Sequence, residues 1–364
     1  MKNILVLFGG KSVESEVSII TGLITVNALD GDKYRAIPVY VNGNGEWYYH
    51  ECLKDIDELK NLNEKRLNRV CLLDGDHALY RLKNKKLKKL FDITAVINCT
   101  HGGDGENGAL AGKINTAGIP LASPPVCPSA ICMDKGVTKV ALKGLKVKTL
   151  PYKIMTCGKV DFSGLEFGFP VIVKPVSGGS SIGVGTANDQ KELKTALSTA
   201  FRYDEKVIVE PLLENFVEIN CACYQDGDNG VVVSECERPI ASGKALSFDD
   251  KYLSGNREYP ANIPTRTANR IKALTKKIYN ELGFRGIIRI DFFLVDGKIF
   301  VNEINSIPGS MAYYLFCSST TEYGKLLDSL IKFACLEFER GQTLVKKIPR
   351  VILNSTGTKG AKRL

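Results

Sequence analysis

The sequence has few of the residues that build metal or disulfide frameworks. Its three histidines, His50, His77 and His101, are too few and too far apart for a zinc site. Its 11 cysteines form no CxxC pair, and scattered thiols in odd number are typical of a reducing cytoplasm rather than of a disulfide framework. No apolar run approaches the roughly 20 residues of a membrane span. The N-terminal MKNILVLFGG enters glycines after a short apolar run, which predicts a first strand and no signal peptide.

Two nucleotide-binding signatures are also missing or incomplete. No GxxxxGK[ST] sequence occurs, which excludes a Walker A loop. Gly103, Gly105 and Gly108 match GxGxxG, but no Asp or Glu occurs between Ala109 and Met133, where a dinucleotide fold places its ribose-binding acid. We therefore interpret this loop as a helix N-terminus that faces a substrate.

The remaining composition is that of an ordinary globular protein. The chain has 364 residues, of which 44% are hydrophobic and 24% charged, enough for two or three domains. The net charge is +9, but six Lys or Arg and no acid lie in 344–364, which leaves +3 for the rest. That excess is too small to predict a nucleic-acid partner, and we expect no membrane partner and a solvated basic tail at 346–364.

Strand and helix patterns alternate through the first part of the chain. Buried strands are predicted at 3–8, 34–41 and 95–98, with a helix after Gly9-Gly10 whose N-cap is Ser12. The chain between the second and third strand has no clear pattern. The alternation predicts a doubly wound α/β sheet for roughly the first 120 residues.

Prolines at 124, 125 and 128 predict a boundary, beyond which further elements follow. We expect helices at 130–142, 189–201 and 264–283, and strands at 169–175 and 206–209. The segment 238–262 has no periodicity and is long for a loop inside a compact domain, which predicts a functional role.

The stretch 289–309, RIDFFLVDGKIFVNEINSIPG, predicts two strands joined by a tight turn at Asp296-Gly297. Side chains alternate between the two faces of a strand, so each strand places two polar side chains on one face. These are Arg289 and Asp291 on the first strand, and Glu303 and Asn305 on the second.

The turn decides whether those two faces coincide. A two-residue loop would point the carboxylates of Asp291 and Glu303 to opposite sides, whereas a three-residue loop would bring them together beside Arg289. If they converge, two carboxylates and the Asn305 amide form an oxygen set suited to Mg²⁺. The alternative is a hairpin with a polar face toward solvent.

A second candidate site follows the strand at 169–175. Lys174 stands near the end of that strand, where a buried lysine needs an anion. The loop SGGSSIG at 177–183 comes next, and its backbone N–H groups and serines are suited to phosphate oxygens. The alternative is a flexible turn. Three other candidate site residues have ordinary structural explanations. Glu14 can be a carboxylate favoured by the helix dipole at a helix start. His101 can be a turn residue, and Tyr252 an aromatic residue on the surface.

Taken together, seven motifs resemble the D-alanine–D-alanine ligase family of the ATP-grasp superfamily. They occur in family order over about 300 residues: GGKSVESEVS at 9–18, HGGDGENG at 101–108, MDK at 133–135, KPVSGGSSIGV at 174–184, DDKY at 249–252, RID at 289–291 and NEINSIPG at 302–309. The resemblance implies an α/β and α+β protein, with a Rossmann-like domain followed by an ATP-grasp fold. We expect domains at 1–123, 124–210 and 211–345, with a lid at 238–262.

The resemblance also implies roles. Lys135, Lys174 and Ser181 would hold ATP phosphates, with Glu210 at the adenine, Glu218 at the ribose and Lys251 at the transferred phosphoryl group. Asp291, Glu303 and Asn305 would bind Mg²⁺ or Mn²⁺. Glu14 would bind the first amino acid in a trio with Ser180 and Tyr252, His101 would face the substrate, and Arg289 with the Gly309 N–H would form the oxyanion site. The implied reaction joins two D-amino acids, with D-Ala–D-Ala as first choice, for peptidoglycan synthesis in the cytoplasm, and a homodimer is expected.

The sequence departs from the family pattern at the second-substrate site. Tyr314 stands where the family has a serine that receives the acceptor's carboxylate, Gly178 replaces a common acid and Pro211 a polar hinge residue. Lys251-Tyr252 favours an amine acceptor over a hydroxy acid. The alternatives are a different second substrate, such as D-Ser, or a nucleotide-binding relative without turnover.

Overall fold

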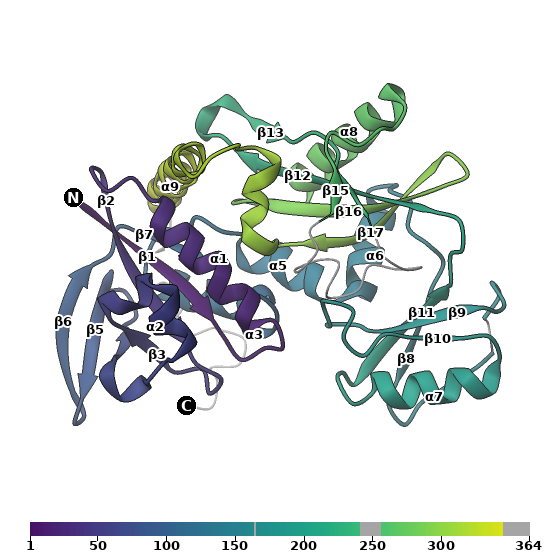
Figure 1. Cartoon of the computed structure of the whole chain (residues 1–364), viewed down its shortest axis with the longest axis horizontal. Coiled ribbons are helices and arrows are strands. Elements are labelled where there is room, and N and C mark those ends of the chain that lie inside the picture. The colour runs from purple at the N-terminus through teal and green to yellow at the C-terminus, as the bar shows by residue number, and fades with distance from the viewer. Residues whose placement is uncertain (164, 241–255, 345–364) are drawn as a thin grey trace, which may run out of the picture.

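The computed structural model describes residues 1–163, 165–240 and 256–344. Its strands form three main sheets, each with helices packed against it (Figure 1). The sheets follow one another along the chain, and a cavity lies where they meet. Within these ranges, no helix is long and apolar enough to cross a membrane.

The N-terminal sheet has seven strands in the order β6-β5-β4-β3-β2-β1-β7. β1 pairs in parallel with both β2 and β7, which confirms the strands predicted at 3–8, 34–41 and 95–98. The chain between β2 and β7 adds an antiparallel series of four strands that no sequence pattern indicated. The strand bounds are β1 Lys2–Gly9, β2 Tyr34–Val41, β3 Trp47–Tyr49, β4 Asn68–Leu72, β5 Ala78–Lys83, β6 Lys86–Asp92 and β7 Ala95–Asn98.

Helices α1 (Ser15–Ala28), α2 (Ile56–Lys60), α3 (Gly103–Glu106) and α4 (Ala109–Thr116) accompany this sheet. The expected N-cap at Ser12 is wrong, because α1 begins three residues later with Glu14 at the cap position. The Ser12 hydroxyl instead accepts a hydrogen bond from the Glu14 N–H at 3.1 Å. The tight turn before α1 therefore fixes Glu14 at the helix start.

The predicted helix at 130–142 is also wrong, because two helices occupy that region. α5 (Val126–Met133) and α6 (Lys135–Gly144) are separated at Asp134, whose backbone is extended with ψ 106°. Its carboxylate caps α6 by accepting from the Val137 N–H at 2.9 Å. A pattern of apolar residues cannot show such a break, because Asp134 ends one helix and caps the next with no residue between them.

The central sheet has the order β10-β9-β11-β8 and is covered by α7. Its elements are β8 Lys153–Thr156, β9 Val171–Pro175, β10 Gly185–Ala187, α7 Gln190–Ala200 and β11 Lys206–Pro211. The helix predicted at 189–201 is confirmed, with Asp189 as its N-cap.

The C-terminal sheet has the order β13-β12-β16-β17. Its strands are β12 Val217–Gln225, β13 Val231–Val233, β16 Ile288–Val295 and β17 Lys298–Asn305, and β14 Arg238–Pro239 pairs separately with β15 Arg257–Glu258. α8 (Thr265–Glu281) packs against this sheet. α9 (Thr320–Gln342) returns to α1, where the Tyr323 and Thr25 hydroxyls are 2.9 Å apart, so the N- and C-terminal parts share one core.

The β16–β17 hairpin has the shorter of the two loops considered from the sequence, yet it does not separate the two carboxylates as that loop predicts. It turns through two residues, Asp296 and Gly297, both with positive φ (49° and 71°), but a β-bulge follows in β17. Val301 pairs with Phe292 and Glu303 with Asp291, so Asn302 is an extra residue. The bulge shifts the alternation by one, and the two carboxylates therefore lie opposite each other despite the short turn.

Candidate active site

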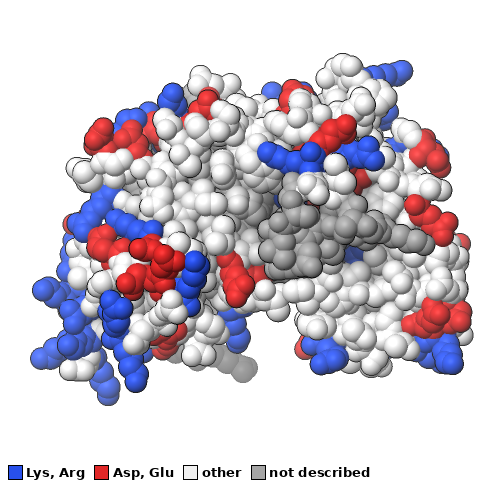
Figure 2. All heavy atoms as spheres, in the orientation of Figure 1, with Lys and Arg blue, Asp and Glu red and all other residues white. Residues whose placement is uncertain are grey.

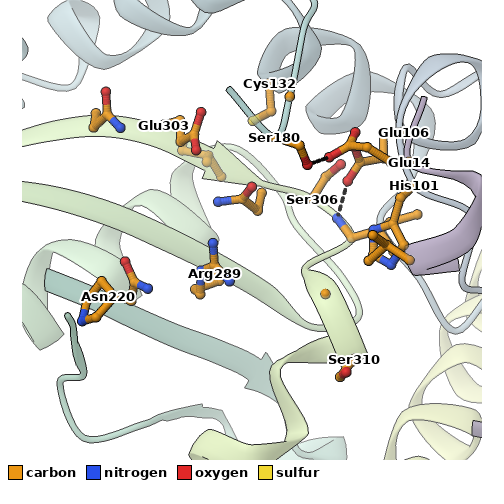
Figure 3. A pocket seen from close by; sticks show the side chains of 18 of the residues that line it. Glu14, His101, Glu106, Cys132, Ser180, Asn220, Arg289, Glu303, Ser306 and Ser310 are labelled. Atoms are coloured by element: carbon orange, nitrogen blue, oxygen red, sulfur yellow. Dashed lines mark hydrogen bonds between the residues drawn. The ribbon is translucent and has the colours of Figure 1, made fainter. Parts of the chain in front are cut away.

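A cavity of about 520 Å³ lies between the three sheets; it is lined by strand residues of the C-terminal part of the chain and by helix and loop residues of the other two parts. Figure 3 shows side chains from β17, the loops after β1 and β7, and the glycine-rich loop after β9 converging on it. Its walls combine acids, lysine, arginine and serine with a similar amount of apolar surface. Such a cavity is suited to a ligand that carries both charged and apolar parts.

The floor of the cavity is the polar face of β16 and β17. Asp291, 1% exposed, receives two hydrogen bonds from the Arg289 guanidinium, Nε at 2.7 Å and Nη2 at 2.9 Å. Asn305 Nδ2 donates to the same carboxylate at 3.0 Å, and Glu303 lies directly opposite Asp291. Arg289 is thereby oriented in the plane of a buried carboxylate, and the paired charge raises its pKa despite burial.

These donors fit a hard divalent cation by their chemistry. Two carboxylates and an amide oxygen on adjacent strands are the ligands that Mg²⁺ takes when phosphates supply the rest. Among the residues the structure describes, no group of three or more His, Cys, Asp or Glu side chains could hold a metal ion by protein ligands alone. Asp291, Glu303 and Asn305 supply three side chains at most, so a cation held there would need further oxygen ligands, which a phosphate can supply.

The glycine-rich loop after β9 lies across from this floor. Ser180 has φ 51° and its hydroxyl donates to the Glu14 carboxylate, which joins the loop to the start of α1. The Lys135 ammonium donates to the Gly178 carbonyl. A Cβ on Gly179 would lie 2.8 Å from Glu14 Oε2, so a larger residue there would displace the Glu14 carboxylate. Burial lowers the pKa of Lys135.

Behind the cavity, two lysines share one buried carboxylate. Glu210 Oε1 lies 2.6 Å from Lys139 Nζ, and Oε2 lies 2.8 Å from Lys174 Nζ. Burial alone would raise the pKa of Glu210, but the two ammonium groups lower it to about 2. The trio holds Lys174 at the end of β9 with its charge balanced.

A buried chain of hydrogen bonds connects the N-terminal sheet to the loop that follows β17. The Thr21 hydroxyl on α1 accepts from the Ser310 N–H at 3.0 Å and lies 2.9 Å from His101 Nε2. Burial lowers the pKa of His101 to about 4, so the ring is neutral, and its other nitrogen bonds the backbone of Ile307. The Thr21 proton therefore points to Nε2, and the backbone around Gly309 is held from the other domain.

Glu106 holds the same loop from a second direction. Its Oε1 accepts from the Ile307 N–H at 3.1 Å and its Oε2 from the Gly102 N–H at 3.0 Å. Burial, then the nearby charge of Glu14, raises the pKa of Glu106 to about 8. Glu106 and Ile307 both line the cavity, and Figure 3 shows Glu106 next to His101.

Past Gly309 the chain makes a left-handed turn. Ser310, Met311 and Ala312 have φ of 51°, 52° and 47°, a conformation that costs about 1 to 2 kcal/mol for each non-glycine residue. Burial of Met311 and Ala312 offsets this cost. The turn directs Tyr314 into the cavity, where the Arg257 guanidinium lies 4.6 Å from the ring centre.

The cavity brings together most of the site residues expected from the sequence. Those that line it are Glu14, His101, Lys135, Ser180, Glu218, Arg289, Glu303, Asn305, Gly309 and Tyr314. Four more lie next to this lining without being part of it: Asp291, Lys174 and Glu210 behind it, and Ser181 beside it in the loop. The adenine-binding role of Glu210 stays a prediction, because both of its carboxylate oxygens bond lysines. Lys251 and Tyr252 lie outside the described residues.

Sequence reasoning missed three residues that position the site: Thr21, Glu106 and Lys139. Glu106 belongs to the HGGDGENG motif. Lys139 follows Lys135 by four residues, and residues spaced four apart lie on the same side of a helix, so this spacing could have placed Lys139 near the site. Nothing local indicates Thr21, whose partners are 80 and 289 residues away.

A central and a C-terminal sheet that enclose a cavity with lysines, a glycine-serine loop and paired acids define the ATP-grasp fold. Family models described as the N-terminus and C-terminus of D-ala D-ala ligase match residues 3–124 and 146–333. The chain belongs to the D-alanine–D-alanine ligase family.

Individual relatives agree with this assignment. The D-alanine–D-alanine ligase of Thermosipho melanesiensis is 33% identical over 349 residues, which cover 93% of this chain and 95% of that protein. The crystal structure of the Helicobacter pylori D-alanine–D-alanine ligase matches with a TM-score of 0.77 and 30% identity, covering 90% and 98%. The VanG D-Ala:D-Ser ligase of Enterococcus faecalis matches with a TM-score of 0.76 and 26% identity, covering 92% and 99%.

Proposed function

We propose that this protein is an ATP-dependent ligase that joins two D-amino acids, with D-alanine in both positions, for peptidoglycan synthesis. The observation that carries the proposal is the convergence of Asp291 and Glu303 on one side of the β16–β17 hairpin. Glu303 and the glycine-serine loop line the same cavity, and Asp291 lies behind that lining. Oxygen ligands on one wall and phosphate donors on the other are what a nucleotide triphosphate requires.

The reaction proceeds in two steps. A carboxylate oxygen of the first D-amino acid attacks the γ-phosphorus, the bond to the bridging oxygen breaks, and ADP leaves with that electron pair. The amine of the second amino acid then attacks the acyl carbon of the acylphosphate, loses a proton, and phosphate leaves as the peptide bond forms. Both steps develop negative charge on oxygen.

The chain's residues divide this work. Lys135 and Lys174 bind phosphate oxygens, and Glu14, fixed by Ser180, receives the first ammonium group. Arg289 and the Gly309 N–H stabilise the oxyanion that forms on the acyl carbon. Asp291, Glu303 and Asn305 would hold Mg²⁺, which supplies charge neutralisation at the phosphates.

The acceptor end of the cavity departs from the family pattern, because Tyr314 narrows it. Its hydroxyl donates the hydrogen bond that a serine would, and burial raises its pKa, so it stays protonated. A second candidate function therefore keeps the same chemistry with D-serine as acceptor, since a VanG-like D-Ala:D-Ser ligase has the same fold. A homodimer and a cytoplasmic location are further parts of this proposal.

The test supplies the protein with ATP, Mg²⁺ and D-alanine and measures dipeptide and phosphate. Equal amounts of both are expected from wild type, and far less of each from Asp291→Asn. A panel of second substrates follows, on wild type and Tyr314→Ser, where the smaller side chain should admit larger acceptors. Nucleotide binding without ADP release for any D-amino acid pair would reject the ligase assignment in favour of a binding protein without turnover.

A further inference from the structure

The β5–β6 hairpin at the edge of the N-terminal sheet concentrates positive charge. Residues 81–89 include six Lys or Arg and no acid. The hairpin reverses at Asn84-Lys85, both with positive φ (50° and 61°), a two-residue turn that keeps the strands in tight register. Figure 2 shows Lys and Arg side chains gathered at the left edge of the molecule, over β5 and β6.

The register places like charges directly opposite each other. Arg81 pairs with Lys88 and Lys83 with Lys86, and the alternation of side chains puts all four on one face. We call these four residues the basic face. Their Cα atoms form a rectangle of about 5 by 7 Å. Directly opposed like charges destabilise a sheet, so this face is kept at a cost.

No carboxylate of the described chain forms an ion pair with these four side chains. Lys89 does have a partner, since its ammonium lies 2.5 Å from Asp92, but Lys89 projects from the other face. Lysines on an edge strand also prevent edge-to-edge pairing, which explains those on β6. That explanation fails for Arg81 and Lys83, because β5 is already paired on both sides.

We propose that the basic face docks on the anionic surface of a phospholipid bilayer. Clusters of four to eight Lys or Arg bind anionic headgroups, which lie in a plane as these side chains do. Residues 81–89 contain no aromatic side chain on which a nucleic-acid base would stack.

Docking through this hairpin leaves the active-site cavity open. β6 is one edge of the seven-stranded sheet and β7 the other, and the loop after β7 carries His101 into the cavity wall. The expectation of no membrane partner rests on the lack of an apolar run long enough to span a bilayer, which does not bear on contact with its surface. The net charge of +3 outside the basic tail hides the cluster, because only the hairpin register brings four cations onto one face.

The experiment uses the full chain and vesicles of phosphatidylcholine, with and without phosphatidylglycerol, in a co-sedimentation assay at low and high salt. The test variant is R81Q/K83Q/K86Q/K88Q. A matched control, K143Q/K148Q/K191Q/K276Q, removes four exposed cations elsewhere and has the same net charge. Ligase activity in solution and the melting temperature verify that both variants fold.

Wild type and control should sediment with phosphatidylglycerol vesicles at low salt and be released at high salt, and neither should bind phosphatidylcholine alone. The test variant should lose at least about tenfold in vesicle affinity. It should melt no lower than wild type, because like-charge repulsion is removed. Equal binding by the test variant would assign the effect to the basic tail and overturn the proposal. So would binding to a single-stranded oligonucleotide without binding to vesicles, or no vesicle binding by wild type.

Discussion

The Thr21 hydroxyl offers the sharpest test of how the N-terminal domain serves the site. Thr21 is 1% exposed and accepts from the Ser310 N–H, next to the Gly309 N–H that we assign to the oxyanion site. Thr21→Val keeps the shape of the side chain but removes the hydroxyl. The Ser310 N–H and the acceptor nitrogen of His101 both lose their partner, and both Thr21 and His101 are buried.

The size of the effect follows from those two lost hydrogen bonds. Each buried polar group left unpaired costs about 1 to 3 kcal/mol, so Thr21→Val should lose roughly 2 to 6 kcal/mol of stability and melt several degrees lower. A displacement of about 1 Å in a positioned donor reduces the rate by about 100-fold. We therefore expect kcat to fall by about 10- to 100-fold, while KM for ATP stays within about twofold, because the nucleotide contacts are untouched.

The assay is steady-state kinetics with D-alanine and ATP, beside a thermal melt of each variant. Thr21→Ser is the matched control, because it keeps the hydroxyl and loses only a methyl group. It should retain most of kcat and most of the melting temperature. If Thr21→Val and Thr21→Ser lose the same amount, or if Thr21→Val loses no kcat, the hydroxyl does not position the oxyanion loop and the reasoning is refuted.

Three further predictions concern charge. Glu210→Gln should destabilise the fold by about 3 to 5 kcal/mol, because two buried lysines lose their counter-charge. The control Glu214→Gln, at an exposed position, should leave the melting temperature unchanged. Equal melting temperatures of the two variants would contradict this prediction. Burial lowers the pKa of His101 to about 4, from about 6.5 in the unfolded chain. The contribution of His101 to the free energy of unfolding is therefore complete above pH 6.5, and roughly 3 kcal/mol of it is lost as the pH falls toward 4. A melting temperature followed against pH should show this fall in wild type and not in His101→Gln. Asp291→Asn should raise the Mg²⁺ concentration that gives half-maximal rate and lower kcat by at least about 100-fold, and an unchanged Mg²⁺ titration would remove Asp291 from the metal site.

Local signals carried much of the fold. Apolar runs followed by Gly, Pro or Asp were enough to predict β1, β2, β7, α7 and α8, and the ordered motifs were enough for the family. The residue pattern led to a wrong prediction wherever a single residue changed the direction of the chain. Asp134 divides one expected helix into two, and Ser12 caps nothing because α1 starts at Ser15.

For the site, too, some features could be predicted from the sequence and others could not. The sequence alone determined which chemical groups are present and that they come in two clusters: a lysine with a glycine-serine loop, and two acids with an arginine and an asparagine. It could not determine that the acids converge, because the two-residue turn by itself would have separated them.

Only the tertiary structure decided that point, through the extra residue Asn302 in β17. It also decided that Thr21 and Glu106 hold the loop around Gly309, and that four cations of one hairpin share a face. The physical reason is common to all three. Side-chain direction along a strand changes with every residue, so a single bulge or register step reverses it, and contacts between residues far apart in the chain leave no trace in the local pattern.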